Sequence, residues 1–339
     1  MKRLLIVSCC VVGLIFSCSE STVQRFTLQG PAFGTTYGIA YFSDQQNPDL
    51  ETALDSVFLA INNSVSTYLP NSDISKINNG NATLEIDPIF IDNFLLSKSV
   101  FEQTQGYFDP TVGTLRNAYG FGDTAPAKQL DLATIDSLRA LVGFNKVQLT
   151  AKNTIAKQHP AIYLDFNAVA KGYAVDQVAL MFDRMQIPNY LIEIGGEIRA
   201  KGLNLEKNQP WIVGIEAIDS ERDSRSLAAR VSLKDKSMAS SGNYRKFRVD
   251  SATGQKYVHT INPLTGSAAK SDVTSATVFA KSCAKADAYA TSFMAMGIER
   301  SLKLLPELED VQVYLTYVDS IGDSQVYISE QLEPHLIKD

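Results

Sequence analysis

The spacing of apolar residues predicts two strands and then two helices in the first third of the chain. Residues 25–42 read as two strands around a turn at Phe33-Gly34. Residues 48–69 place Leu50, Leu54, Val57, Phe58 and Ile61 on one side of a helix. A second helix is expected across residues 89–105. The chain therefore opens as a mixture of strands and helices.

The middle of the chain continues this mixture around one irregular segment. Residues 106–123 contain several Gly and one Pro, and we expect a long loop of the kind that often carries function. A short helix ended by Gly143 follows. Strands are then predicted at residues 146–150 and 161–166. The next segment predicts a helix from Val169 to Met185, whose apolar stripe is Val175, Val178, Phe182 and Met185.

The last part of the chain is richer in predicted strands. Gly195-Gly196 bends a strand pair over residues 189–202, and residues 211–217, 227–235 and 237–242 add strands and a turn. A strand at residues 275–280 leads into a helix that Gly297 stops. Residues 311–329 form a closing hairpin with Gly322 at its turn. Because no linker separates two parts, we expect an α+β fold, one domain of mixed sheets flanked by helices.

Composition permits a full-sized core and gives no sign of a nucleic-acid partner. The chain has 339 residues, 45% of them hydrophobic, and a formal net charge of -6. There is no basic stripe, so we expect no nucleic acid among its partners.

The N-terminus predicts export and a lipid anchor. Lys2 and Arg3 precede a short apolar stretch and small residues, the layout of a signal peptide. The stretch 15–18, Ile-Phe-Ser-Cys, resembles a bacterial lipobox in which Cys18 is lipidated. We therefore expect a signal peptide at 1–17, a lipidated tether at 18–24 and the domain at 25–339. The alternatives are an uncleaved anchor or an ordinary signal.

This leader implies an extracytoplasmic, membrane-anchored lipoprotein on the periplasmic side of the inner membrane. Three of the four cysteines lie in the leader, and only Cys283 remains in the body. No intramolecular disulfide is therefore expected.

The stretch "YLDFNAVAKGYAVDQV", residues 163–178, places Asp165 at the end of a predicted strand and before a helix. Its small residues leave room for a ligand at the backbone, and the first amides of the helix suit a phosphate or another anion. The alternative is that Asp165 or Asn167 simply caps the helix.

Two further stretches contain candidate chemistry. Asp287 and Thr291 are four residues apart and share one side of the predicted helix, where their hard oxygens suit Mg²⁺; the alternative is an Asp in the first turn with an incidental Thr. His259 ends a short strand before a turn at Asn262-Pro263 and is a candidate general base, or else a structural His.

Gly195-Gly196 and residues 240–242 are weaker candidates for amide donors lining a cleft. The sequence contains no Walker loop, dinucleotide fingerprint, CxxC pair or GxSxG elbow. The best-known nucleotide and hydrolase sites are therefore not expected.

Taken together, these motifs resemble a known family. Its landmarks here, in order, are "FGTTY", "STYLPNSDISKIN", "FDPTVGTL", "YLDFNAVAKGYAVD", "LIEIGGEIRAKG", "SMASSGNY", "HTINPLTG" and "ADAYATSFMAMG". The chain resembles the FAD:protein FMN transferases, or ApbE family, which includes membrane-anchored flavin-trafficking lipoproteins. The resemblance implies a Mg²⁺-dependent reaction in which FMN passes from FAD to a Thr or Ser hydroxyl of a target flavoprotein through a phosphoester, and AMP leaves.

The resemblance also implies roles for individual residues. Asp287, Thr291 and the backbone carbonyl of Ala168 would hold Mg²⁺, and His259 would take the proton of the acceptor hydroxyl. Asp165 and Lys171 match FAD-contacting positions. The residues matching the flavin and adenosine pocket are Phe33, Tyr68, Ala118, Tyr119, Gly120 and Ile261.

Two positions depart from the family pattern: position 33 is often Met and position 171 is acidic in some members, whereas this chain has Phe33 and Lys171. Two other functions stay open from the sequence. One is a FAD pyrophosphatase that yields FMN and AMP, and the other is a non-enzymatic flavin-binding lipoprotein.

Overall fold

A computed structural model describes residues 23–127, 130–218, 226–243, 247–249, 256–268 and 271–337. The predicted signal peptide at 1–17 and Cys18 lie outside these residues. Within the described part of the chain, no helix is both long and apolar enough to span a bilayer.

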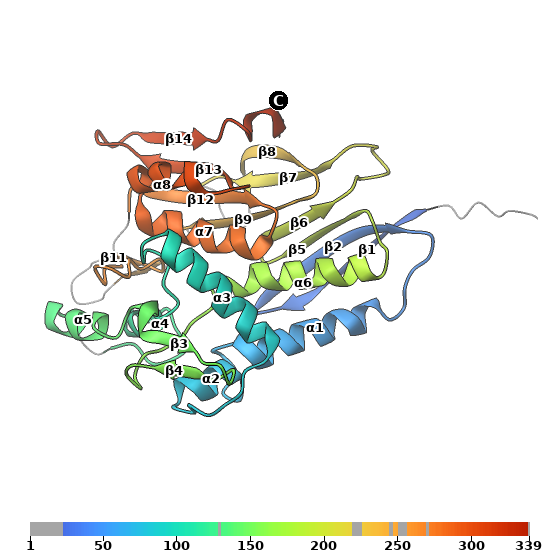
Figure 1. Ribbon diagram of the computed structural model, residues 1–339. Helices are drawn as coiled ribbons and strands as arrows, with labels where there is room; N and C mark the ends of the chain where they lie inside the picture. The colour runs from blue at the N-terminus through green and yellow to red at the C-terminus, as the bar shows by residue number, and fades with distance from the viewer. Residues whose placement is uncertain are drawn as a thin grey trace, which may run out of the picture.

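An antiparallel sheet of eight strands forms the centre of the fold (Figure 1). Its spatial order is β1-β2-β5-β6-β9-β12-β13-β14, and every neighbouring pair is antiparallel. The strands are β1 (Gln24–Ala32), β2 (Thr35–Ser43), β5 (Tyr190–Ile194), β6 (Glu197–Lys201), β9 (Lys236–Gly242), β12 (Val273–Ala280), β13 (Gln312–Val318) and β14 (Ser324–Ile328).

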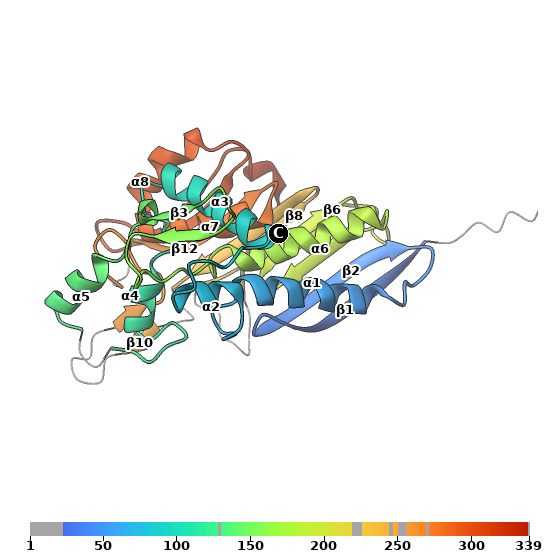
Figure 2. The same ribbon diagram turned by 60° about the horizontal axis from the view of Figure 1, so that its bottom comes forward.

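Both faces of most of this sheet are buried, because alternate residues of strands such as β2 enter different hydrophobic clusters. In β2, Tyr37, Ile39 and Tyr41 pack in the helix-side cluster, whereas Ala40 and Phe42 pack on the opposite side. The helix layer contains α1 (Leu50–Val65), α3 (Pro88–Gln103), α6 (Ala170–Arg184) and α7 (Cys283–Met296) (Figure 2). The other face is covered by β7 (Trp211–Glu216), β8 (Leu227–Leu233) and β15 (Leu336–Ile337).

Smaller elements surround these layers. The helices are α2 (Asp73–Asn78), α4 (Gly113–Ala118), α5 (Leu132–Arg139) and α8 (Ile298–Leu304), with 3-10 turns at Phe144–Lys146, Leu305–Glu307 and Glu333–His335. The strands are β3 (Val147–Leu149), β4 (Ile155–Lys157), β10 (Phe247–Val249) and β11 (Lys256–Val258).

The predicted glycine turns are confirmed. Phe33 and Gly34 both have positive φ, 50° and 74°, in the tight turn between β1 and β2. Gly195 and Gly196 have φ of 62° and 104° between β5 and β6. The Gly195 N–H donates to the carbonyl of Thr36 at 3.0 Å, so the two turns meet at one end of the sheet.

The expected strand at residues 161–166 is wrong. This segment is extended but has only an isolated bridge, between Tyr163 and Val112. The side chain of Asn78 takes the place of a partner strand: its Nδ2 donates to the Leu164 carbonyl at 2.9 Å, and its Oδ1 accepts from the Leu164 N–H at 2.8 Å. A side-chain amide satisfies the backbone here, so no ladder forms.

The irregular segment at 106–123 is also more ordered than expected, because it contains α4. The other predicted elements appear close to where the apolar spacing places them, whereas α2, α8, β4, β10 and β15 were not predicted. The α+β class, with mixed sheets flanked by helices, is confirmed.

Candidate functional site

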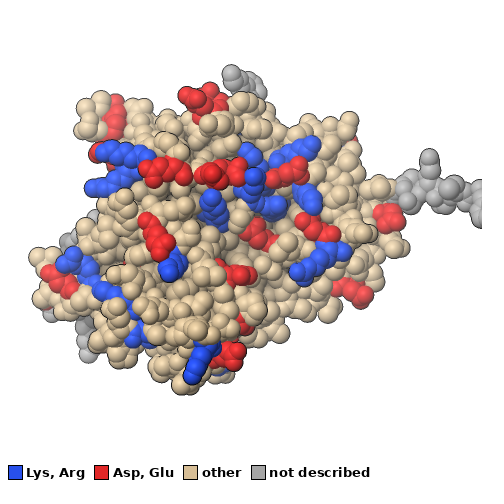
Figure 3. Space-filling model, in the orientation of Figure 1, with Lys and Arg blue, Asp and Glu red and all other residues tan. Residues whose placement is uncertain are grey.

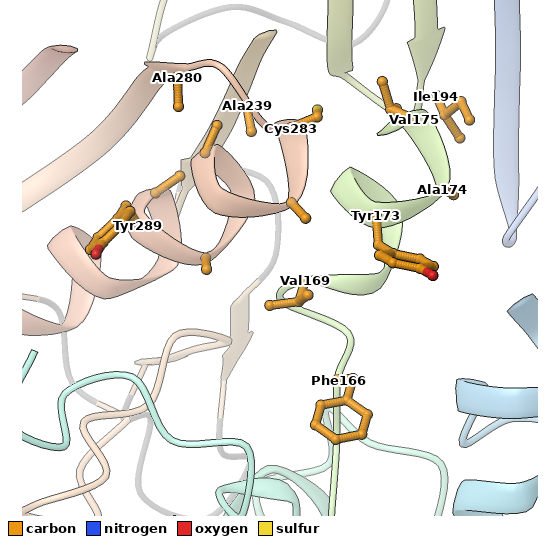
Figure 4. Packing of buried hydrophobic residues seen from close by; sticks show 14 of the residues in the cluster. Phe166, Val169, Tyr173, Ala174, Val175, Ile194, Ala239, Ala280, Cys283 and Tyr289 are labelled. Carbon is orange, nitrogen blue, oxygen red and sulfur yellow. The ribbon is translucent and has the colours of Figure 1, made fainter. Parts of the chain in front are cut away.

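The candidate site begins where α6 and α7 meet. Asp176 of α6 accepts hydrogen bonds from the N–H groups of Cys283 and Ala284 and from the hydroxyl of Ser282, at 2.8 to 3.0 Å. It thereby satisfies backbone donors at the start of α7 that have no partner within the helix. Figure 4 shows Val169 and Tyr173 at the start of α6 beside Cys283 at the start of α7.

Gly172 permits this close approach. A Cβ at this position would lie 2.5 Å from the Cys283 carbonyl oxygen and 2.7 Å from the Ala284 Cα, both of them backbone atoms. Any side chain would therefore push the two helices apart. This close approach explains the glycine of the Lys-Gly pair at the start of α6.

Asp287 lies at this junction and is nearly buried, with 4% of its surface exposed. Its Oδ2 accepts a hydrogen bond from the Gly172 N–H at 3.1 Å. Burial raises the pKa of the Asp287 carboxyl, and the Lys171 charge opposes that rise. Thr291 lies one turn further along α7, as the spacing predicts, and its hydroxyl is 3.4 Å from that of Ser241 at the end of β9.

The segment before α6 leaves a carbonyl free. Val169 is the N-cap of α6 and has no side-chain capping bond, so the alternative that Asp165 or Asn167 caps the helix is wrong. The Gly172 N–H, which a helix beginning one turn earlier would direct to residue 168, bonds to Asp287 instead. Within the described residues, no donor bonds to the Ala168 carbonyl. Carboxylate, hydroxyl and carbonyl oxygens together are ligands that suit a hard cation.

Lys171 forms an ion pair with Glu197, the residue that follows the Gly-Gly bend. The Glu197 side chain is 3% exposed, and its second carboxylate oxygen has no hydrogen-bond partner. Burial raises the pKa of Glu197 to about 7, Lys171 lowers it, and Asp287 raises it further. Two buried carboxylates therefore share one ammonium group. That Lys171 contacts FAD stays a prediction, since its ammonium is bonded to Glu197 here.

Two buried carboxyls, Asp287 and Glu197, lie near the single ammonium of Lys171, so the junction favours a cation when both are ionised. Among the described residues, no group of three His, Cys, Asp or Glu side chains could hold a metal ion. A metal here would thus depend on the single carboxylate of Asp287 with neutral oxygens beside it.

Asp165 and Tyr68 are brought together by Arg116 of α4. One terminal nitrogen of Arg116 pairs with Asp165 Oδ2, and the other donates to the Tyr68 hydroxyl at 2.5 Å. Sequence reasoning did not select Arg116 or Glu197. The available signals were a single Arg in the Gly-containing segment at 106–123 and an acidic residue after two glycines.

The other predicted pocket residues are mostly buried around α4. Tyr119, Ala118 and Ile261 have 2%, 7% and 6% of their surface exposed. The Tyr119 hydroxyl donates to the Gly266 carbonyl at 2.9 Å, and its ring lies 5.0 Å from that of Tyr257. The segment that carries His259 therefore packs on α4.

Four predicted residues lie at the edges of this arrangement. His259 directly follows β11 and is partly buried, as expected of a strand end before a turn. Phe33 packs edge-on against Phe58, with ring centroids 5.3 Å apart. Gly120 has φ of 79°, and Tyr68 is 58% exposed. Arg116 of α4 thus joins Tyr68 to Asp165, and the chain continues from Asp165 through Ala168 into α6.

A groove of about 800 Å³ lies elsewhere, between β8, β14 and β15, and no predicted site residue lines it. On the face drawn in Figure 3, basic and acidic side chains are interspersed. The local charge of the candidate site therefore comes from its own buried groups.

Known proteins resemble the chain over nearly its whole length. A protein named FAD:protein FMN transferase from Vibrio cholerae is 34% identical over 337 residues, covering 96% of this chain and 97% of the relative. A protein of the same name from Haemophilus influenzae is 32% identical and covers 93% of both.

Solved structures agree with these sequence matches. The structure described as Flavin Transferase ApbE from Vibrio cholerae superposes with a TM-score of 0.81 at 32% identity, covering 93% of this chain and all of that one. The model of the ApbE family matches residues 33–315. Because the family model, the relatives and the solved structures agree, this chain belongs to the ApbE family.

Proposed function

We propose that this protein transfers FMN from FAD to a Thr or Ser hydroxyl of an extracytoplasmic flavoprotein through a phosphoester bond, releases AMP and depends on Mg²⁺. The relatives named FAD:protein FMN transferase support the reaction. The observation that carries the metal site is the contact between Asp287 and Gly172. It holds a buried carboxylate at the start of α6 and takes up the N–H that a longer helix would direct to the Ala168 carbonyl.

The residues at the junction fit Mg²⁺. Asp287, Thr291 and the Ala168 carbonyl would hold the ion, and their oxygens match its preference. Ionisation of both Asp287 and Glu197 would set two negative charges against the single positive charge of Lys171, and a bound cation would favour that ionised state against the raised pKa values of the two carboxyls. When bound, Mg²⁺ would neutralise charge that develops on the pyrophosphate of FAD.

The chain's own groups would perform the remaining steps. The acceptor oxygen forms a bond to the FMN phosphorus, and the bond from that phosphorus to the bridging oxygen breaks, so that AMP leaves with the electron pair. His259 would take the proton of the acceptor hydroxyl. Gly172 and the Lys171–Glu197 pair would hold the Asp287 carboxylate and its surroundings in place.

The pocket residues would bind FAD around this centre. Phe33 and Tyr68 offer aromatic rings, and Tyr119, Ala118, Gly120 and Ile261 would shape the wall formed by α4 and the segment after β11. The resemblance of residues 15–18 to a lipobox supports a lipid anchor at Cys18 on the periplasmic side, close to exported acceptors; attachment to the inner rather than the outer membrane is part of the proposal.

The main alternative is a FAD pyrophosphatase, in which water replaces the acceptor hydroxyl at the same site. To separate the two, the purified protein is incubated with FAD, Mg²⁺ and an acceptor domain that carries a single reactive Thr. Peptide mass spectrometry should find FMN covalently bound to that Thr. The proposal fails if no adduct forms while AMP accumulates, or if FAD stays intact.

A further inference from the structure

Both oxygens of the Asp165 carboxylate already have a partner within the protein. Its Oδ1 accepts a hydrogen bond from the Asn167 N–H at 2.7 Å, and its Oδ2 pairs with Arg116. Only 7% of the residue is exposed. The negative charge of Asp165 is thus neutralised by Arg116 within the protein.

Arg116 connects Asp165 to an exposed aromatic ring, that of Tyr68. Its side chain is 16% exposed, and its second terminal nitrogen donates to the Tyr68 hydroxyl at 2.5 Å. The guanidinium carbon lies 5.8 Å from the centroid of the Tyr68 ring. Although Tyr68 is 58% exposed, its hydroxyl end is therefore held.

Backbone contacts fix the Asp165 segment against the start of α4. The Asp165 N–H donates to the Pro110 carbonyl at 2.7 Å, and Val112 forms a bridge with Tyr163. At Gly113, the first residue of α4, a Cβ would lie 2.7 Å from the Tyr163 ring and 3.3 Å from the Asp165 Cβ. Arg116 thus reaches Asp165 and Tyr68 from a helix that is fastened to the Asp165 segment.

We propose that Arg116 is a positioning residue for FAD: it holds the Tyr68 ring as a surface on which one of the flat rings of FAD stacks, and Asp165 acts on FAD through Arg116. This inference rests on the proposed function, which makes FAD the substrate. Pre-orienting an exposed side chain improves affinity because less freedom is lost when the ligand binds.

The test measures FAD affinity by flavin fluorescence for the wild type and for Arg116→Met, Tyr68→Phe and Asp165→Asn. Arg116→Met and Tyr68→Phe should each weaken binding by about 10-fold, within the range of one ring stack. The double variant Arg116→Met/Tyr68→Phe should bind FAD no more weakly than Arg116→Met alone, because both changes remove the same hydrogen bond between Arg116 and Tyr68. At saturating FAD, kcat should stay near that of the wild type.

The second arm asks whether Asp165 touches FAD directly. Arg116→Met/Asp165→Asn should bind FAD as Arg116→Met does, and a further loss overturns the inference. This double variant leaves no unpaired buried carboxylate. If Arg116→Met alone fails to fold, the double variant is compared with the wild type, and its affinity should be lower by about the same 10-fold. The matched control is Arg25→Met, which removes an exposed arginine of β1 paired with Glu206 and should not change the affinity.

The outcomes separate the two claims. If the wild type binds FAD and Arg116→Met binds it equally well, the inference is wrong and the proposed function stands. If the wild type binds no FAD under any condition, both are wrong. Weaker binding without a change in circular dichroism, together with a non-additive double variant, supports the inference.

Discussion

The backbone N–H of Gly172 in α6 donates to the carboxylate of Asp287 in α7 at 3.1 Å. This contact joins two segments that are 115 residues apart. It directs a buried carboxylate toward the end of the "FNAVA" stretch, and it takes up the N–H that would otherwise bond to the Ala168 carbonyl. A helix junction can therefore assemble oxygen ligands from a sequence that has no dense acidic motif.

Gly172→Ala should separate α6 from α7. The new Cβ would lie 2.5 Å from a backbone carbonyl oxygen, so relief requires helix movement. We expect a loss of about 1–3 kcal/mol in the free energy of unfolding and weaker Mg²⁺-dependent transfer, measured by urea denaturation and activity. The control is Gly38→Ala in β2, where the nearest atom is a side-chain oxygen at 3.7 Å. Equal stability of the two variants would contradict the packing account.

Ser241→Ala should weaken metal binding. Its hydroxyl lies 3.4 Å from that of Thr291 and would orient this ligand. Loss of a partner that orients a ligand typically costs about 10- to 100-fold in metal affinity. The measurement is the Mg²⁺ concentration that gives half of the thermal stabilisation, alongside half-maximal activity. The control is Ser240→Ala at the preceding residue, because the Ser240 hydroxyl bonds to that of Thr277 instead. Equal effects of both variants would remove Ser241 from the site.

His259→Ala should slow transfer by about 10²–10⁴-fold, the usual contribution of a general base, and leave FAD affinity close to that of the wild type. Stopped assays of flavin transfer and flavin fluorescence measure the two quantities. His159→Ala is the matched control, because the His159 Nδ1 only accepts from the Ala161 N–H in an exposed turn. A parallel loss of binding and transfer would indicate that His259 has a structural role.

The sequence predicted the secondary structure well wherever periodicity and glycine turns dominate. The spacing of Asp287 and Thr291 on one helix and the Phe33-Gly34 turn needed no tertiary information. The strand at 161–166 was wrong because Asn78, a residue from another element, satisfies its backbone. No periodicity reveals such a partner.

The site was predicted less completely, because its contacts join distant segments. The ion pair of Lys171 with Glu197 and that of Arg116 with Asp165 both cross between elements. A sequence pattern identifies a charged residue but not the residue that will neutralise it. The excess carboxylate at the junction could therefore be seen only in the fold.

Asp109 should make stability depend on pH. Burial raises its pKa from 3.8 to about 6, although Thr111 and the Phe144 N–H donate to it. Because the folded-state value is raised, this contribution is fully present below pH 4 and is lost as the pH rises through about 6, by up to about 3 kcal/mol. Urea denaturation of the wild type and Asp109→Asn measures it.

The stability of the wild type relative to Asp109→Asn should fall as the pH rises from about 4 to 7. This follows because only the wild type carries the titrating group at position 109. A difference that stays constant over this range would contradict the raised pKa.

The most direct test of the account is the ratio of AMP released to FMN bound covalently to an acceptor Thr in a single incubation. We predict one AMP for each FMN bound, and neither product without Mg²⁺ or with Asp287→Asn, which can keep the hydrogen bond from Gly172 but loses the charge. AMP release without covalent FMN, or an unchanged rate in Asp287→Asn, would contradict the account.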